Sequence, residues 1–313
     1  MKRYAAVALA ETAATGVLWG TSFPVIDFGI KSGIPPLVFA SLRFGIAGLI
    51  MLMLAVAFRR QILGTLRSAP VWILTALNAV GFLAQFVGQA YTPASVAAIL
   101  VNLSIIIAAV GSVIVLRERF TSSKVAGTVL ALLGILLLTT KGNLSALQNA
   151  QAFGEALYLI SAVSWGAYII YNKRSTDALQ WDPVAVTASI VLLTGVFMAP
   201  VMVVYSSDVT SLGTQSWSII LYTAVVNTAI PYVLYQRGLR YLTATVSSVV
   251  LMLEVVTAVV ISAVFLGETL DSFSLIGAGA ILVSIYLVSA AAETTKNLSA
   301  LESNITGQGT ASD

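Results

Sequence analysis

The stretch LRERFTSSKVAGTVLALLGILLL at residues 116–138 returns as LGETLDSFSLIGAGAILVSIYLV at residues 266–288, 150 positions later. Both stretches end a longer repeat, in which residues 88–138 align without a gap to residues 238–288 and 15 of the 51 positions are identical. Basic residues mark opposite ends of the two copies: Arg117, Arg119 and Lys124 in the first, Arg237 and Arg240 beside the start of the second. In a membrane chain, this exchange predicts that the copies are inserted upside down relative to each other.

The composition indicates a membrane protein. Hydrophobic residues make up 58% of the 313 residues, charged residues only 9%, and the mean hydropathy is +0.95. A soluble domain carries about 25% charged residues, so this chain has too few charges to cover a water-exposed surface of its size. The fold class expected is therefore an all-α integral membrane protein.

Apolar segments long enough to span a bilayer recur along the chain, separated by short polar or charged turns. We expect ten transmembrane helices, at residues 8–30, 36–57, 71–91, 94–116, 122–140, 153–172, 183–204, 216–236, 242–265 and 272–291. They divide into a first five-helix repeat at 8–140 and a second at 153–291. Five is an odd number, so the second repeat starts from the opposite face of the membrane. Residues 292–313 are polar and are expected to form a tail.

The Lys and Arg residues sort to one side of the expected spans. One side carries thirteen of them, the other carries only Lys31 and Lys141, and Arg43 lies inside the second span. The positive-inside rule then places both termini in the cytoplasm. The membrane that we expect for this chain is the inner membrane of a bacterium.

Several function classes are excluded by what the chain lacks. It has no cysteine and no histidine, which removes thiolate and histidine metal sites and histidine-based catalysis. We expect no metal, no cofactor and no enzymatic activity. The net charge of +3 comes from basic residues in short loops rather than along one face, so nucleic acid is not an expected partner.

The chain resembles the EamA family of the drug/metabolite transporter superfamily. The residues that carry the resemblance are WGTSFPVI at 19–26, ASLRFGIAGLIML at 40–52 and the two copies quoted above. The resemblance implies ten helices in two inverted repeats and transport of small metabolites such as amino acids by alternating access, often as an exporter. Many relatives carry a proline in the middle of the fourth and ninth helices. Here residues 101–110 and 251–260 contain none, so a proline hinge is not expected there.

Glu254 is the sharpest candidate for a functional residue. It lies in the middle of the ninth span, without a basic residue one turn away. Lipid burial disfavours an ionised carboxylate, so Glu254 is expected to bind and release a proton during transport or to pair with a substrate amine. The alternatives are that Glu254 forms a structural pair with Arg43, or that it stays protonated and hydrogen-bonded. Arg43 itself is interpreted as a snorkelling or helix-pairing arginine.

Polar and aromatic side chains on repeat-related helices predict a shared central cavity. Interhelical hydrogen bonding, and packing in the case of the aromatic residues, is the alternative for each of them. With Glu254, the cavity candidates are Trp19, Phe23, Asn78, Gln85, Asn102, Trp165, Tyr168, Asn227 and Tyr235.

Proline and glycine within spans suggest where the helices bend or meet. Pro24 and Pro231 remove backbone hydrogen bonds, and with Gly20 they are the expected gating hinge. Gly127 and Gly134 share one helix face and permit close helix contact, either within the chain or in a homodimer. The sequence is compatible with both a monomer and a homodimer.

Together these features predict a secondary active transporter in the lipid bilayer, which moves a small polar or amphipathic molecule, with amino acids favoured by the resemblance. The alternatives are a carrier of nucleotide sugars or other organic metabolites, and a channel. Phosphorylated substrates require paired basic residues, and Arg43 is alone within the spans. A channel lacks support because no ring of like charges is present.

Overall fold

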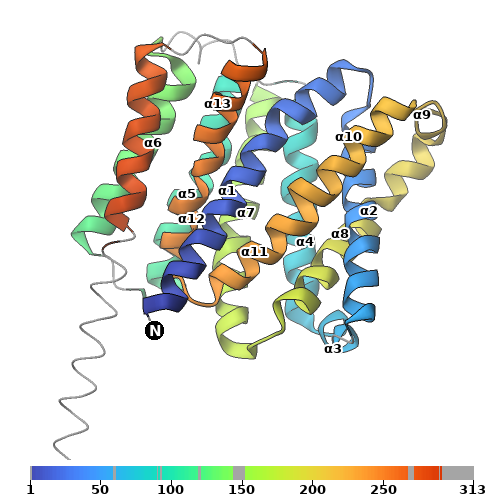
Figure 1. Cartoon of the computed structure of the whole chain (residues 1–313), viewed down its shortest axis with the longest axis horizontal. Coiled ribbons are helices and arrows are strands. Elements are labelled where there is room, and N and C mark those ends of the chain that lie inside the picture. The colour runs from blue at the N-terminus through green and yellow to red at the C-terminus, as the bar shows by residue number, and fades with distance from the viewer. Residues whose placement is uncertain are drawn as a thin grey trace, which may run out of the picture.

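The computed structural model describes residues 2–58, 61–89, 91, 94–118, 121–143, 152–266, 271–288 and 290. Within these ranges the chain is a bundle of helices without a strand (Figure 1). The expected polar tail, 292–313, lies outside the described residues.

The helices coincide with the segments that the sequence indicates as spans. The first half holds α1 (Lys2–Lys31), α2 (Pro36–Ala57), α4 (Ala69–Gly88), α5 (Ala94–Leu116) and α6 (Ser122–Thr140), with the short α3 (Ile62–Leu66) as a connection. The second half holds α7 (Ala152–Leu179), α8 (Pro183–Val204), the short α9 (Ser206–Thr210), α10 (Thr214–Ala224), the π-helix η2 (Val225–Ala229), α11 (Ile230–Leu239), α12 (Ala244–Leu251) and α13 (Leu253–Leu266). A final apolar helix runs over Ser272–Val288.

Local sequence explains where several helices begin. Pro36 and Pro183 stand in the first turn of α2 and α8, where a helix needs no backbone N–H donor. The side chain of Asp182 accepts hydrogen bonds from the first two backbone amides of α8, and Thr243 accepts one from Val246 at the start of α12. These signals delimit helices of the length that a bilayer requires.

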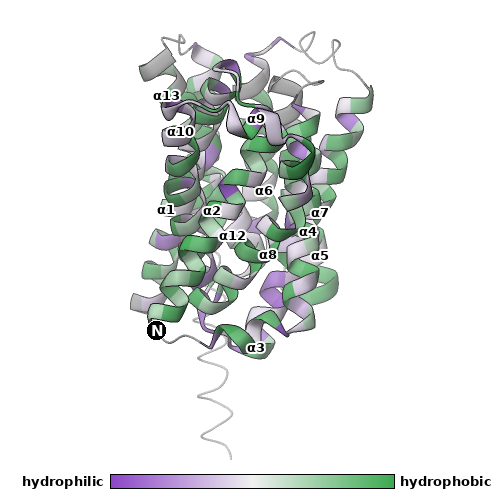
Figure 2. Cartoon of the chain, turned by 90° about the vertical axis from the view of Figure 1, so that its right-hand side faces the viewer, coloured by the Kyte–Doolittle hydropathy of each residue, from purple (hydrophilic) through white to green (hydrophobic). Residues whose placement is uncertain are grey.

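The outward surface of the bundle is apolar. Within the described part of the chain, six helices or helix runs are long and apolar enough, by length and composition, to cross a membrane, and three shorter apolar helices accompany them. Large side chains such as Ile114 and Val203 are more than 70% exposed, which is costly in water and favourable in lipid. Figure 2 shows that hydrophobic residues recur along the length of the helices. The chain is thus a multi-pass membrane protein.

Helices of one half pack against helices of the other half. Helix α1 contacts α11, α12 and α13, while α7 contacts α4 and α5. Helix α2 packs along α8. The first helix of each half therefore lies against the third and fourth helices of the opposite half, and the second helices lie against each other. The two halves interlock into one bundle rather than forming separate domains (Figure 1).

Glycines allow these helices to cross closely. A Cβ atom at Gly195 of α8 would lie 2.9 Å from the Cα of Gly45 on α2. A Cβ at Gly134 of α6 would lie 2.8 Å from the carbonyl oxygen of Gly277 on the final helix. Gly127 of α6 faces Ser284 and Val288 of that final helix. The glycine face of α6 is therefore used for packing within the chain.

Replacing Gly134 with alanine should destabilise the bundle, because the new methyl group meets backbone atoms of the final helix that have no room to move. We expect G134A to melt several degrees below the wild type in a thermal unfolding assay in detergent. Gly279 provides a matched control, because a Cβ there meets nothing within 4 Å. G279A should melt at or above the wild-type temperature, since alanine favours the helix. Equal melting of the two variants would contradict this packing.

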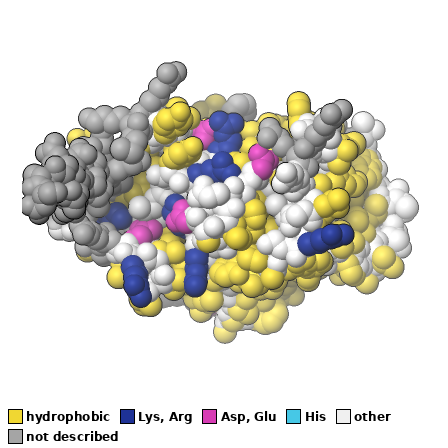
Figure 3. Space-filling view, turned by 90° about the horizontal axis from the view of Figure 1, so that it is seen from below, with side chains coloured by type: hydrophobic (Ala, Val, Ile, Leu, Met, Phe, Trp, Pro, Cys, Tyr) yellow, Lys and Arg dark blue, Asp and Glu magenta, His cyan; other side chains and the backbone are white. Residues whose placement is uncertain are grey.

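The end of the molecule that carries the N terminus is also the end where charged side chains gather. Figure 3 views this end and shows Lys and Arg side chains interspersed with Asp and Glu. One ion pair here joins the Arg237 guanidinium to the Glu11 carboxylate at 2.8 Å, and another joins Lys173 Nζ to Asp177 at 2.7 Å. A polar end of this kind is suited to the membrane–water boundary.

Candidate functional site

A cavity of about 930 Å³, which includes the space at its mouth, lies between the two halves of the bundle. Helices α1, α2, α4, α5, α7 and the α12–α13 junction all contribute to its wall. Its polar and aromatic lining comprises Trp19, Ser22, Arg43, Phe82, Gln85, Phe86, Gln89, Asn102, Ser104, Trp165, Ser248 and Glu254. Among the described residues, no group of three or more carboxylates is placed to hold a metal ion.

Five of the candidates from the sequence line this cavity together: Trp19, Gln85, Asn102, Trp165 and Glu254. Four others do not line it and are buried in helix contacts: Asn78, Tyr168, Asn227 and Tyr235. The side chain of Phe23 lies outside the described residues. Candidates from both halves thus converge on one cavity, while the others hold the helices around it.

The two tryptophans occupy reciprocal positions. Trp19 of α1 packs against Tyr232 and Tyr235 of α11, with ring centroids 5.6 Å and 6.0 Å apart. Trp165 of α7 packs edge-on against Phe82 of α4 at 4.8 Å. Each tryptophan belongs to one half of the chain and packs against aromatic rings on a helix of the other half. Their rings give the cavity flat apolar surfaces.

The paired asparagines act as bridges between helices. The side chain of Asn78 on α4 donates to Thr194 of α8 at 3.0 Å and accepts from the hydroxyl of Tyr232 at 2.6 Å. The amide of Asn227 in η2 donates to the carbonyl of Leu18 on α1 at 2.6 Å. Both side chains are fully buried. Their hydrogen bonds fit the structural interpretation of these amides better than contact with a substrate.

Arg43 has a role that the sequence indicated only in part. Pro231 has no N–H, which frees the carbonyl of Asn227 four residues earlier, within the π-helix η2. The Nη2 of Arg43 donates to this carbonyl at 2.8 Å, and its Nε donates to the Thr228 hydroxyl at 2.6 Å. The arginine of α2 therefore satisfies the irregular backbone of η2, as a helix-pairing residue should. It also lines the cavity, which its sequence position did not show.

The helix is interrupted between α12 and α13, although neither of them contains a proline. Helix α12 ends at Leu251, Met252 forms a turn, and α13 begins at Leu253. The amide of Val255 bonds to the carbonyl of Met252 at 3.0 Å, three residues back rather than four. This break places Glu254 in the first turn of α13, beside the cavity. Interrupted helices are typical of binding sites in membrane transport proteins.

Buried aromatic and polar side chains join α7 and α11 on the side of the bundle nearer the N terminus. Tyr168 and Tyr235 are buried between α7 and α11. Beyond them, Asn172 of α7 donates to Gln236 of α11 at 2.9 Å, and the Gln236 amide donates to Thr176 at 2.7 Å. This contact joins two helices of the second half.

The residues expected to form a hinge have packing roles in this structure. Helix α1 is continuous through Gly20 and Pro24. A Cβ at Gly20 would fall on the carbonyl oxygen of Glu254 and 2.6 Å from the Cβ of Thr257. Gly20 thus lies directly against α13. Pro231 follows the π-helix η2, where Arg43 compensates for its missing hydrogen bond.

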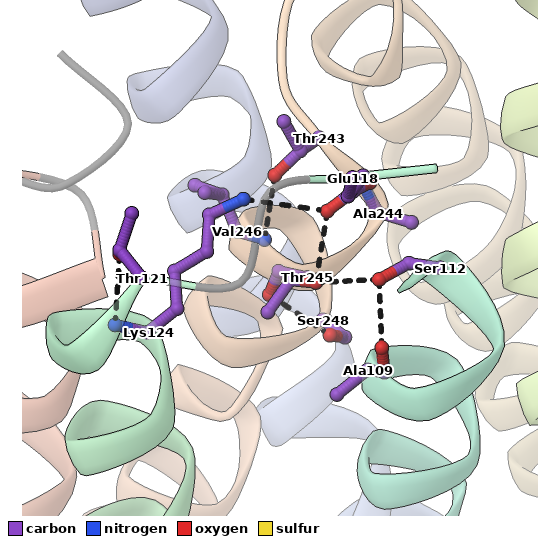
Figure 4. Close-up of polar contacts among 10 residues, drawn as sticks. All are labelled: Ala109, Ser112, Glu118, Thr121, Lys124, Thr243, Ala244, Thr245, Val246 and Ser248. Carbon is purple, nitrogen blue, oxygen red and sulfur yellow. Dashed lines mark hydrogen bonds and ion pairs between the residues drawn. The ribbon is translucent and has the colours of Figure 1, made fainter. Parts of the chain in front are cut away.

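A second buried polar cluster joins the two halves at the N-terminal end (Figure 4). Glu118, which follows α5, accepts from the backbone amide of Ala244 at 2.7 Å and from the Thr245 hydroxyl at 2.9 Å, both at the start of α12. Lys124 of α6 forms an ion pair with the same carboxylate at 3.4 Å, and Ser112 hydrogen-bonds to Thr245 at 2.9 Å. Glu118 thus caps a helix of the opposite half. The sequence repeat contains Glu118 but gave no indication of this partner.

The chain is similar to several transport proteins along almost its whole length. It is 29% identical over 290 residues to a probable amino-acid metabolite efflux pump of Salmonella typhimurium, covering 87% of this chain and 91% of that protein. It is 26% identical over 292 residues to an uncharacterized transporter of Archaeoglobus fulgidus, covering 92% and 99%. An uncharacterized inner membrane transporter of Escherichia coli is 26% identical over 288 residues, covering 87% of each chain.

A solved crystal structure has the same fold, with a TM-score of 0.77 and 17% sequence identity, covering 92% of this chain and 98% of that one. The model of the EamA-like transporter family matches the chain over residues 7–140 and again over residues 152–290. The cavity, the apolar exterior and the relatives all describe a membrane transport protein rather than an enzyme. The chain belongs to the EamA-like transporter family.

Proposed function

We propose that this protein is a secondary active transporter that exports small polar or amphipathic metabolites, with amino acids as the favoured class, by alternating access. The observation that carries the proposal is the central cavity, where two opposite charges, three amides and two tryptophans meet within an apolar bundle. Polar groups inside a membrane are costly and mark substrate pathways. Amino acids and the outward direction are supported by the name of the Salmonella relative.

The proposal includes ten spans arranged as two inverted five-helix repeats, 8–140 and 153–291. The family model matches the chain twice, over nearly these ranges, which supports the duplication. The reciprocal packing of α1 and α7 supports it as well. Thr121 and Asp271, which are 150 positions apart, each cap the start of a helix by accepting a hydrogen bond from the amide three residues later.

The proposed orientation has both termini in the cytoplasm of a bacterial cell, as the charge count favours. The lining residues lie in the C-terminal halves of α1 and α4 and in the N-terminal halves of α2 and α5. Because the chain changes direction at each turn, all of these halves lie on the side farther from the N-terminal face. With the Asn172–Gln236 contact and the Glu118 cluster closed, this arrangement is consistent with a state open away from the cytoplasm. The opposite state would open these contacts.

Within this mechanism, Glu254 is proposed to exchange a proton for the substrate. The only other charged side chain lining the cavity, among the described residues, is Arg43. Exchange by the wild type in liposomes is expected to depend on pH across a series from about pH 5 to about pH 9. Glutamine cannot ionise, so E254Q should lose this pH dependence. A variant with unchanged rate and unchanged pH dependence would remove this role.

Other substrate and function classes are less compatible with the cavity. Phosphorylated groups such as those of nucleotide sugars are bound by paired Arg or Lys residues, and Arg43 is the only basic residue in the described lining. A channel would show an open path or a ring of like charges. Among the described residues, the charged side chains that line this cavity are Arg43 and Glu254, one of each sign, and they form no such ring.

Flux measurements on the purified protein in liposomes test the proposed function. We expect saturable uptake of radiolabelled amino acids, accelerated when unlabelled amino acid is present on the opposite side of the membrane. Non-saturating ion current without exchange would indicate a channel and overturn the proposal. A thermal-shift screen against amino acids and related metabolites selects the compounds for this assay, because a ligand stabilises the folded state that binds it.

A further inference from the structure

The cavity is lined by one basic and one acidic side chain that do not pair with each other. Arg43 projects from α2 in the first half of the chain, and Glu254 lies at the start of α13 in the second half. In the described part of the chain no ion pair joins them, although both line the same cavity. The structural pair that the sequence left open is therefore not formed. Two separated charges in an apolar bundle require another explanation.

The guanidinium of Arg43 is fixed in place and still has donors to offer. Its side chain is 2% exposed, and its Nε and Nη2 bond to Thr228 and to the carbonyl of Asn227. The rings of Phe44 and Phe82 each lie 5.7 Å from its central carbon. Within the described residues, no protein acceptor binds Nη1 and no carboxylate pairs with the charge. A buried, immobile and uncompensated guanidinium matches a carboxylate ligand in charge and in shape.

The carboxylate of Glu254 is similarly without a partner inside the protein. No hydrogen bond or ion pair reaches it from any described residue. Its position is set by the break at Met252 and by the close contact of its backbone with Gly20. The backbone is thus held on both sides while the side chain faces the cavity. An ammonium group would compensate the ionised carboxylate at this position.

We propose that the cavity recognises a zwitterion, with the carboxylate of the ligand at Arg43 and its ammonium group at Glu254. This inference rests on the proposed transport function and assigns the two charged groups of the substrate to residues of opposite halves. A ligand with only one of the charges leaves the other buried charge of the protein uncompensated. Trp19 and Trp165, which line the same cavity, offer flat surfaces to the side chain of the ligand. Discrimination thus depends on charge separation more than on side-chain identity.

A matched ligand series on the full-length wild-type protein tests the proposal without any mutation. L-Phenylalanine carries both charges, L-phenylalaninamide only the ammonium group, and N-acetyl-L-phenylalanine only the carboxylate; L-leucine and its two analogues repeat the comparison. Dissociation constants come from thermal shift and calorimetry in detergent. We expect each zwitterion to bind at least about tenfold more tightly than either of its analogues, because each analogue leaves one buried charge unpaired. Equal affinities, or no binding of either zwitterion, would overturn the proposal.

Two variants then assign the charges to their residues. R43Q should lose the preference for phenylalanine over phenylalaninamide and keep the preference over the N-acetyl compound, and E254Q should show the reverse pattern. Because Arg43 also holds the eighth span, R43K provides a second variant that keeps the charge and should retain part of the preference. If R43Q still preferred phenylalanine over phenylalaninamide, or E254Q still preferred phenylalanine over the N-acetyl compound, the assignment would be contradicted. Saturable exchange in liposomes without any preference for zwitterions would overturn this inference and leave the transport function standing.

Discussion

Replacing Gly20 with valine is expected to reduce substrate exchange in liposomes to about a tenth of the wild-type rate or less. The reason is that bulk added to a closely packed contact displaces the backbone of Glu254. A Cβ at this position would overlap the carbonyl oxygen of Glu254 and lie 2.6 Å from Thr257. Neither the helix backbone nor a β-branched threonine can yield cheaply. The measurement is counterflow of a labelled amino acid by equal amounts of reconstituted wild type and variant.

The control for this prediction lies on α2. A Cβ at Gly45 meets nothing within 4 Å, so G45V adds the same bulk to a span without the overlap. We expect G45V to retain most of the exchange. G20A, with a smaller side chain, should fall between G20V and the wild type. Full exchange by G20V would show that the α1–α13 contact does not set the position of Glu254.

Glu118→Ala is expected to destabilise the protein by about 3 kcal/mol, the cost typical of removing one partner of a buried ion pair. The substitution leaves Lys124, whose side chain is 3% exposed, without the carboxylate that it pairs with. It also removes the acceptor for the Ala244 amide and the Thr245 hydroxyl at the start of α12. Thermal unfolding in detergent measures the loss.

Two comparisons separate this effect from a general loss of charge. The pair between Lys31 and Asp27 is exposed, with 73% and 49% of the side chains accessible, so D27A should change the melting temperature little. Adding K124A to E118A should recover part of the lost stability, since the unpaired lysine is removed. If E118A and D27A melted alike, the cluster in Figure 4 would contribute nothing to joining the two halves.

The helices were predictable because their signal is local. Long apolar runs bounded by residues such as Asp182 and Pro183 indicate where a span begins, and α8 starts there. Trp19 and Trp165 were recognised as cavity candidates because they stand at related positions near the middle of their spans, and both line the cavity.

The irregular parts were not predictable because they depend on partners from the other half. No proline or glycine near Met252 indicates the break in the sequence. The cavity position of Arg43 follows from the π-helix η2, whose freed carbonyl the arginine satisfies. For Asn78, Asn227 and Tyr235, sequence alone indicated polarity within a span but did not distinguish a side chain that bridges helices from one that faces a cavity. That distinction is made by tertiary contacts.

The natural absence of cysteine makes a direct measurement of the transport route straightforward. A single cysteine replaces Gln85, which lines the cavity, and in a separate variant Ser211, which is exposed on a connecting segment. Both are treated in proteoliposomes with a membrane-impermeant maleimide, with and without a transported amino acid, and exchange is then measured. If the cavity is the transport site, modification of Q85C stops exchange, the amino acid slows that modification, and modified S211C exchanges normally. Full exchange by modified Q85C would contradict a route through this cavity.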